Sequence, residues 1–176
     1  MRSTSYPKGP TPVNQRSPNG TRDESQREIV ISRVFDAPRA LVFQAWTDSK
    51  HVAQWWGPSG FSNTLSEMEV RPGGVWQFVM HGPDGAEYKN QISYLEIVKP
   101  ERLVYAHSGD EAVGSTQFHV TVSFAEIGNQ TRLTMRMLFD SAEERDRAEA
   151  FGAVRGGNQT LDRLAGFLID QGGVSA

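Results

Sequence analysis

The sequence predicts an α+β domain in which a curved antiparallel β-sheet wraps around a long C-terminal α-helix. Near the C-terminus, from about Asp140 to Gln171, apolar residues recur at helical spacings of three, four and seven. In the middle of the chain, apolar and polar residues alternate in about six short segments separated by turn residues, which is typical of strands with one buried face. A long isolated helix is not stable in water, so the sheet is expected to cover its apolar stripe.

The first elements are a strand and two short helices. Residues 28–35 are rich in β-branched side chains and predict a strand. The following residues predict a helix capped by Asp36, with Pro38 in its first turn, where a missing N–H costs nothing. A second short helix is expected to start at Asp48 and to end at Gly57-Pro58. Two short helices of this kind are expected to act as a flap.

From residue 61 onward, apolar residues recur at every second position instead of at helical spacings. Alternation places Met135 and Met137 on one face of the last strand, and Phe118 and Val120 on the same face of the strand before it. Gly, Pro, Asn and Asp residues mark the turns between strands. A slip of one residue would reverse the faces of any strand. The predicted strands are 61–70, 75–81, 88–98, 103–107, 116–124 and 131–139, which with the first strand makes a sheet of about six to seven strands.

The C-terminal segment is expected to be one helix that starts at a capping box. Ser141 is followed three residues later by Glu144, and in such a pair each side chain satisfies a free N–H of the other. Gly156-Gly157 lies inside this helix, although glycine costs roughly 0.8–1 kcal/mol there relative to alanine. The two glycines fit either close packing or a kink against the sheet, or additional room for a cavity beside the helix.

The length of 176 residues suits one domain with a tail. Residues 1–27 contain few apolar side chains and several prolines, so they are expected to form a disordered N-terminal tail without a signal peptide. Residues 28–172 form the predicted domain, and residues 173–176 form a flexible C-terminus.

Composition excludes several classes of protein. The net charge is −3 and no basic run is present, which argues against a nucleic-acid partner. No apolar stretch approaches the roughly 18 residues of a membrane span. The absence of cysteine excludes disulfides and thiolate chemistry. These features are typical of a cytoplasmic protein, and the sequence fits a monomer or a homodimer.

No motif predicts a catalytic group, a metal site or a cofactor. The four histidines form no HExxH or HxH pair and have no carboxylate at ligand spacing. Surface or structural histidines are the simplest interpretation. His81 and His107 lie near strand ends, where they could reach the rim of a cavity.

Aromatic and methionine side chains are more numerous than a plain sheet–helix core requires. Large rings and flexible thioethers suit an adaptable apolar pocket with a few polar groups, although each of them also fits ordinary core packing. Polar anchors in such a pocket could come from Tyr88, Asn90, Gln91 or His107.

A set of short motifs resembles one known family over residues 28–171. It is the family similar to the C-terminal domain of the activator of the heat-shock protein 90 ATPase, within the START-like (SRPBCC) superfamily. The resemblance implies a helix-grip fold with a cavity between the sheet and the C-terminal helix. Many relatives carry a Gly-Trp pair just ahead of the last motif, where this chain has Gly157-Asn158-Gln159, so a cavity role for that tryptophan does not transfer. The motifs are Phe35-Asp36-Ala37-Pro38, Ala45-Trp46, Trp55-Trp56-Gly57-Pro58, Arg71-Pro72-Gly73-Gly74 with Trp76, His81-Gly82-Pro83-Asp84-Gly85, Pro100-Glu101-Arg102-Leu103 and Thr160-Leu161-Asp162-Arg163-Leu164.

Together, the residues and the resemblance predict binding of a small hydrophobic or amphipathic ligand, lipid-like or polyketide-like. Two alternatives stay open: a chaperone-linked protein that stimulates a heat-shock protein 90 ATPase, and a cavity enzyme of the polyketide cyclase/dehydratase type. The expected ligand-binding residues are Trp46, Trp55, Trp56, Trp76, Phe78, Met80, Tyr88, Asn90, Ile92, Tyr105, His107, Phe118, Met135, Met137, Phe151 and Val154.

Overall fold

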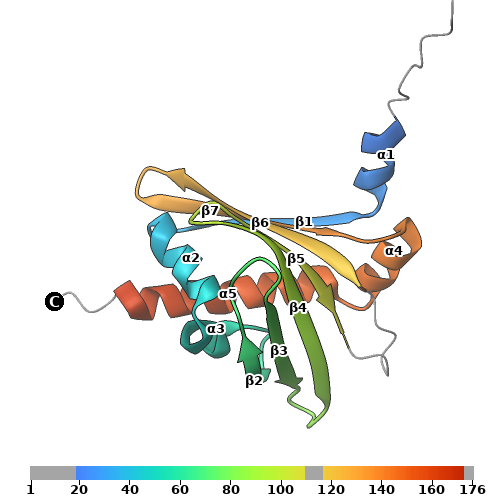
Figure 1. Cartoon of the computed structure of the whole chain (residues 1–176). Coiled ribbons are helices and arrows are strands. Elements are labelled where there is room, and N and C mark those ends of the chain that lie inside the picture. Colours follow the sequence, from blue (N-terminus) through green and yellow to red (C-terminus); the bar gives the residue numbers. More distant parts are fainter. Residues whose placement is uncertain (1–18, 110–116, 173–176) are drawn as a thin grey trace, which may run out of the picture.

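The computed structural model describes residues 19–109 and 117–172 of the chain. Within these residues, the strands form one seven-stranded antiparallel sheet with the order β1-β7-β6-β5-β4-β3-β2 (Figure 1). Strands β2 to β6 each pair with the next strand in the sequence, and β1 pairs with β7. The fold class predicted from the sequence is confirmed. The strands are β1 (Glu28–Phe35), β2 (Ser62–Met68), β3 (Val75–His81), β4 (Glu87–Val98), β5 (Arg102–Ser108), β6 (Phe118–Ile127) and β7 (Gln130–Leu138).

Alternation along the strands places one face of the sheet in the core. Val120 of β6 pairs with Met137 of β7, and Trp76 of β3 pairs with Ile92 of β4. All four side chains are buried. Arg136, the next residue along β7, belongs to the opposite face, where it binds acidic side chains. The strand faces expected from the sequence are therefore those of the folded sheet.

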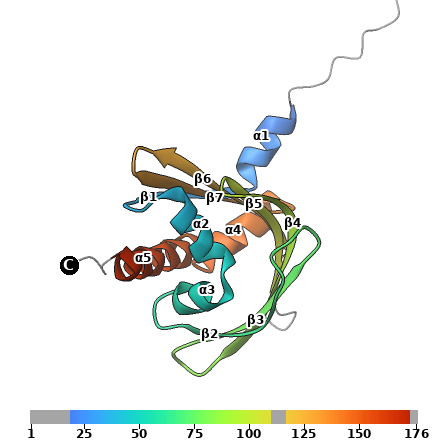
Figure 2. The same ribbon diagram turned by 60° about the vertical axis from the view of Figure 1, so that its left-hand side comes forward.

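Three helices lie on the concave side of this curved sheet (Figure 2): α2 (Arg39–Thr47), α3 (Ser49–Trp55) and α5 (Ala153–Gly172). From Leu161 onward, α5 is anchored by Leu161, Leu164, Phe167 and Leu168, which are all buried. At the level of β1, Arg33 forms an ion pair with Asp162 of α5. The helices α2 and α3 cover one end of the concave face and contact α5, so they are part of the core.

The prediction of one continuous C-terminal helix is wrong. The segment forms two helices, α4 (Ala142–Ala150) and α5, with Gly152 between them at a φ of +97°. Glycine adopts this left-handed conformation without a steric penalty, which allows the chain to end one helix and start another. The predicted cap at Ser141 is confirmed, since its Oγ accepts a hydrogen bond from the Glu144 N–H at 3.1 Å. Phe151 was expected in the buried stripe, but it is the C-cap of α4 and is 83% exposed.

The starts of the two short helices differ in their capping. Pro38 is the N-cap residue of α2 and no side chain caps this helix, so the prediction that Asp36 caps it is wrong. The backbone of Pro38 is extended, which leaves Asp36 two residues ahead of the cap. The helix expected to start near Asp48 is α3, and Asp48 caps it: its side chain accepts hydrogen bonds from the N–H groups of Lys50 and His51.

The last part of the N-terminal segment expected to be disordered forms a helix, α1 (Asn19–Gln26). Glu24 of α1 and Glu28 of β1 both bind Arg136, and Arg27 Nη1 donates to the Phe139 carbonyl at 2.7 Å. Partners far away in the sequence hold this polar segment, so local composition did not reveal them. The rest of the expected tail (1–18) and the expected flexible C-terminus (173–176) lie outside the described residues.

Candidate ligand pocket

A pocket of about 760 Å³ lies between the sheet and the start of α5. Strands β3 to β7 form one wall, and the other is formed by the α4–α5 junction and the first turns of α5. The loop after α3 borders it through Gly57 and Pro58. Most of the side chains expected to bind a ligand lie around this pocket. They are Trp46, Trp56, Met80, Tyr88, Asn90, Tyr105, His107, Phe118, Met135, Met137 and Phe151.

The other expected ligand residues lie outside the lining. Trp55 is fully buried under α2, and its indole N–H donates to the Ala45 carbonyl at 3.1 Å. Trp76 and Phe78 stack on each other with ring centroids 4.4 Å apart, and Ile92 is buried opposite Trp76. Val154 of α5 packs against the core next to the pocket without lining it. These side chains share the correct face of their elements, but their neighbours fill the space in front of them.

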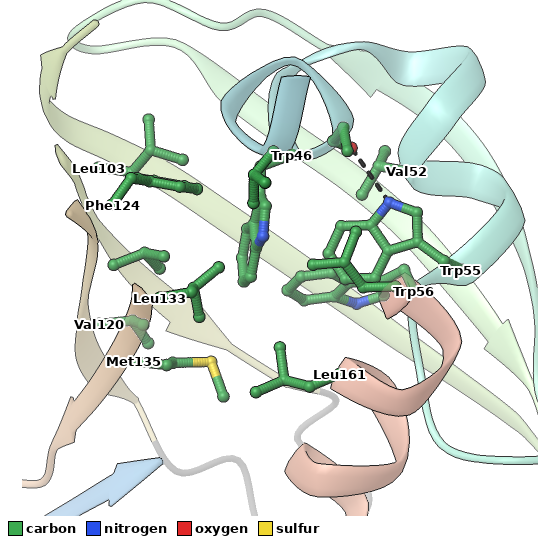
Figure 3. Close-up of a cluster of buried hydrophobic side chains, with 14 of the residues drawn as sticks. Trp46, Val52, Trp55, Trp56, Leu103, Val120, Phe124, Leu133, Met135 and Leu161 are labelled. Carbon is green, nitrogen blue, oxygen red and sulfur yellow. Dashed lines mark hydrogen bonds between the residues drawn. The ribbon is translucent and has the colours of Figure 1, made fainter. Parts of the chain in front are cut away.

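A cluster of tryptophans closes one end of the pocket. Trp46 meets both Trp55 and Trp56 edge to face, at centroid distances of 5.1 and 5.3 Å. In Figure 3, Trp46, Trp56, Met135 and Leu161 converge on one region from α2, α3, β7 and α5. Aromatic pairs in this geometry are worth about 0.5–1.5 kcal/mol beyond the area that they bury. This end of the pocket is therefore a packed aromatic wall, in which the indole N–H of Trp46 is buried without a hydrogen-bond partner among the described residues.

The space exists because the first turns of α5 carry small side chains. Ala153, Gly156 and Gly157 all line the pocket. A Cβ at Gly157 would lie 2.5 Å from Cδ1 of Ile31, so this glycine lets α5 approach β1 closely. A Cβ at Gly156 would be 3.5 Å from Pro58 across the pocket, an ordinary contact distance. Close packing of α5 against Ile31 thus explains the glycine at position 157. Gly156 is part of the pocket lining.

The sheet wall carries one pair of polar side chains. His107 Nε2 lies 3.0 Å from Asn90 Oδ1, and Asn90 Nδ2 donates to the Tyr88 carbonyl at 3.0 Å. With Asn90 in this orientation its Oδ1 is an acceptor, so the proton of neutral His107 is on Nε2 and Nδ1 is left as an acceptor. Burial lowers the pKa of His107 to about 4, which keeps the ring neutral at pH 7. Burial also raises the pKa of Tyr105, so its phenol stays protonated.

Arg163 of α5 fixes the loop that borders the pocket. Its guanidinium donates to the carbonyls of Trp56, Gly57 and Pro58 at 3.0–3.2 Å, and to Gln54 at 3.3 Å. These carbonyls follow the C-terminal end of α3, where a positive charge is favourable. Desolvation lowers the pKa of Arg163. The position of the pocket border therefore depends on one side chain of α5.

Other kinds of site are not apparent in the described part of the chain. Residues 19–109 and 117–172 contain no group of three or more His, Asp or Glu side chains placed to hold a metal ion. Among the helices in those same residues, none combines the length and apolar character needed to cross a membrane.

The family comparison agrees with this arrangement. The model of the family described as "Activator of Hsp90 ATPase homolog 1-like protein" matches residues 36–168, which include the pocket walls. The chain belongs to this family. Its helix-grip fold, with the pocket between the sheet and α5, is the fold that the sequence motifs implied. No curated protein matches the chain at a significant level.

Solved structures show the same fold. A protein from Arthrobacter aurescens has 25% sequence identity and a TM-score of 0.78, with 83% of this chain and 88% of that chain covered. A protein from Mycobacterium smegmatis has 23% identity and a TM-score of 0.77, covering 85% of this chain and 95% of that one. The AHSA1 protein from Silicibacter pomeroyi has 22% identity and a TM-score of 0.68, with coverages of 82% and 99%. At these low identities, the likeness concerns the fold.

Sequence reasoning missed the contribution of the α4–α5 junction. Ala150, Gly152, Arg155, Gln159 and Thr160 line the pocket, and none was expected to do so. Polar and small residues on a helix are ordinarily solvent-exposed, so composition gave no signal for them. The Gly156-Gly157 pair was the available signal, because it marks where α5 has no bulky side chain to fill the space.

Proposed function

We propose that this protein binds a small hydrophobic or amphipathic molecule in the pocket between the sheet and α5. The pocket volume of about 760 Å³ falls within the range of roughly 300–1,000 Å³ that is usual for small-molecule sites. Aromatic rings and methionines dominate its lining, and His107 and Asn90 supply polar groups for orientation. Methionine side chains adapt to ligands of different shape, which suits a lipid-like or polyketide-like molecule.

One observation carries the proposal: a large space remains in an otherwise close-packed core. Protein interiors ordinarily leave few voids larger than a water molecule. Here the side chains at the C-terminal half of α5 fill the concave face, whereas the start of the same helix leaves the pocket beside Met135 and Met137. A fold that only needed a stable core would gain stability from a larger residue at Ala153.

The test is native mass spectrometry on the full chain, purified gently from its own host, followed by extraction of any released molecule. We expect a discrete bound mass. An Ala153→Phe variant places a ring in the pocket and is expected to lose that mass, whereas Ile169→Phe adds the same ring at an exposed site of α5 and is expected to keep it. An empty wild-type protein that also shows no melting shift with a panel of lipids would overturn the proposal.

A catalytic role for the pocket is a second candidate, favoured by His107. The imidazole of His107 is neutral and its Nδ1 is left as an acceptor, so it is able to take a proton from a bound ligand, but its lowered pKa of about 4 makes it a weak base that requires an acidic ligand proton. No carboxylate is present among the described residues that line the pocket, so His107 would act without an acidic partner. The extracted ligand would be incubated with wild type and with His107→Gln. Conversion by the wild type alone, with binding retained in the variant, would establish this role.

The family description suggests a third function, stimulation of a heat-shock protein 90 ATPase. It rests on the family relation, because no pocket feature bears on it. An ATPase assay with purified components tests it directly. Stimulation that persists in the Ala153→Phe variant would separate a chaperone-linked role from ligand binding.

A further inference from the structure

The charges around the pocket are strongly asymmetric. Among the described residues that line it, Arg155 is the one charged side chain, and no Asp or Glu is present. His107, the other ionisable basic group of the lining, is neutral and hydrogen-bonded to Asn90. Among these residues the interior of the pocket is mostly apolar and carries no charge, its polar groups include the neutral His107–Asn90 pair, and the positive charge is concentrated at Arg155.

Arg155 lies where the pocket opens to solvent. It is an exposed residue in the first turn of α5, on the other side of the turn at Gly152 from Phe151, which is 83% exposed and also lines the pocket. Most other arginines of the described residues bind a partner, such as Arg33 with Asp162 or Arg145 with Glu149. Arg155 has no ion-pair or hydrogen-bond partner within residues 19–109 and 117–172. Within the described part of the chain, nothing holds its guanidinium, which is therefore placed to bind a group brought by a ligand.

We propose that the ligand is an organic acid: an apolar body that fills the pocket, with one anionic group that binds Arg155 at the mouth. This inference rests on the proposed binding function and specifies its ligand class. The apolar body would contact Met135, Met137 and Phe118, and the acid would remain at the solvent edge, where its charge loses little hydration. A carboxylate and a phosphate offer the same chemistry to a guanidinium.

The experiment compares probes that share one chain length. Decanoate, decyl phosphate and the neutral decan-1-ol are titrated into the full chain at pH 7, and the fluorescence of pocket residues Trp46 and Trp56 reports binding. Arg155→Gln is expected to weaken the binding of the acids by about two- to fivefold, the range for a solvent-exposed ion pair, without changing that of the alcohol. Added salt is expected to weaken the binding of the two acids to the wild type, but not their binding to Arg155→Gln.

The matched control is Arg132→Gln. Arg132 is an exposed arginine of β7 that also has no partner among the described residues, and it does not line the pocket. This variant is expected to bind all probes as the wild type does. If Arg155→Gln weakens the binding of decanoate alone, the ligand is identified as a carboxylic acid. If it weakens the binding of decyl phosphate alone, the ligand is identified as a phosphate ester. Both results support the inference.

Two results would overturn the inference that the ligand is an organic acid, and they can be told apart. If all probes bind but Arg155→Gln affects acids and alcohol equally, the acid preference is wrong and the proposed binding function stands. If no probe binds to the wild type, the binding function fails and the inference fails with it.

Discussion

The two halves of α5 meet the same sheet in opposite ways. The C-terminal part, taken from Leu161 onward, buries Leu161, Leu164, Phe167 and Leu168 against the sheet and the helices α2 and α3, and Leu161 also borders the pocket. The N-terminal half presents Ala153, Gly156 and Gly157, and a pocket of about 760 Å³ remains in front of it. One helix thus provides both the stability of the domain and the space for a ligand. Substitutions in one half should therefore change stability, and those in the other half should change binding.

The largest expected effect is a loss of stability on truncation in the C-terminal half. Leu164 is fully buried, so Leu164→Ala should lower the free energy of unfolding by about 2–5 kcal/mol, through lost apolar transfer and the cavity left behind. Urea denaturation measures this change. Ile169→Ala is the control on the same helix; its side chain is 71% exposed, and the expected change is within about 0.5 kcal/mol. Equal effects of the two substitutions would contradict the division of the helix.

Facing the N-terminal part of α5, the pocket lining contains His107 of β5, which should make the stability of the domain depend on pH. The pKa of His107 falls from 6.5 to about 4 on folding, so the unfolded chain takes up this proton first as the pH is lowered. Stability should therefore decrease between about pH 6.5 and 4, by at most about 3 kcal/mol. The urea midpoint is measured at several pH values in this range, and it should fall less steeply with decreasing pH in His107→Gln than in the wild type. His119→Gln, at an exposed position of β6, controls for the loss of an imidazole; a wild-type slope in both variants would exclude this role for His107.

A pair of glycine substitutions sharpens the comparison along α5. Gly157→Ala should lower stability by about 1–3 kcal/mol, because the new Cβ would lie 2.5 Å from Ile31 Cδ1. Gly166→Ala meets nothing within 4 Å and should raise stability by up to about 1 kcal/mol through helix propensity. Thermal or urea unfolding distinguishes the two signs. A stabilising Gly157→Ala would mean that the Ile31 side chain, or α5 itself, moves aside at little cost.

The smallest effect on stability is expected at the mouth of the pocket. Phe151 is 83% exposed, so Phe151→Ala should change the free energy of unfolding by less than about 0.5 kcal/mol. If the pocket binds a ligand, the same change should weaken that binding, because Phe151 is part of the lining. Ile169→Ala again serves as the control, with unchanged binding. Binding and stability are measured on the same samples, and a parallel loss of both would argue against a role at the mouth.

Much of the fold was predictable from the sequence. Alternation along the strands and the β-branched first strand indicated the sheet, and their faces were assigned correctly, as the pairs Val120–Met137 and Trp76–Ile92 show. The break in the C-terminal helix was missed because the apolar spacing continues through Phe151 and conceals the turn at Gly152. Periodicity reports which residues are able to share a face, but it does not report where the backbone turns.

The sequence by itself determined the elements, their buried faces and the aromatic and methionine content of the core, because these depend on local spacing and side-chain chemistry. Only the tertiary structure decided which of those side chains face an open space. Trp55, Trp76 and Phe78 have the same composition signal as Trp46 and Trp56, yet their neighbours cover them. It also brought Arg155 to the pocket mouth and Arg163 to the carbonyls of the loop after α3. Both outcomes depend on the distance between elements far apart in the chain, which is set by packing at residues such as Gly157.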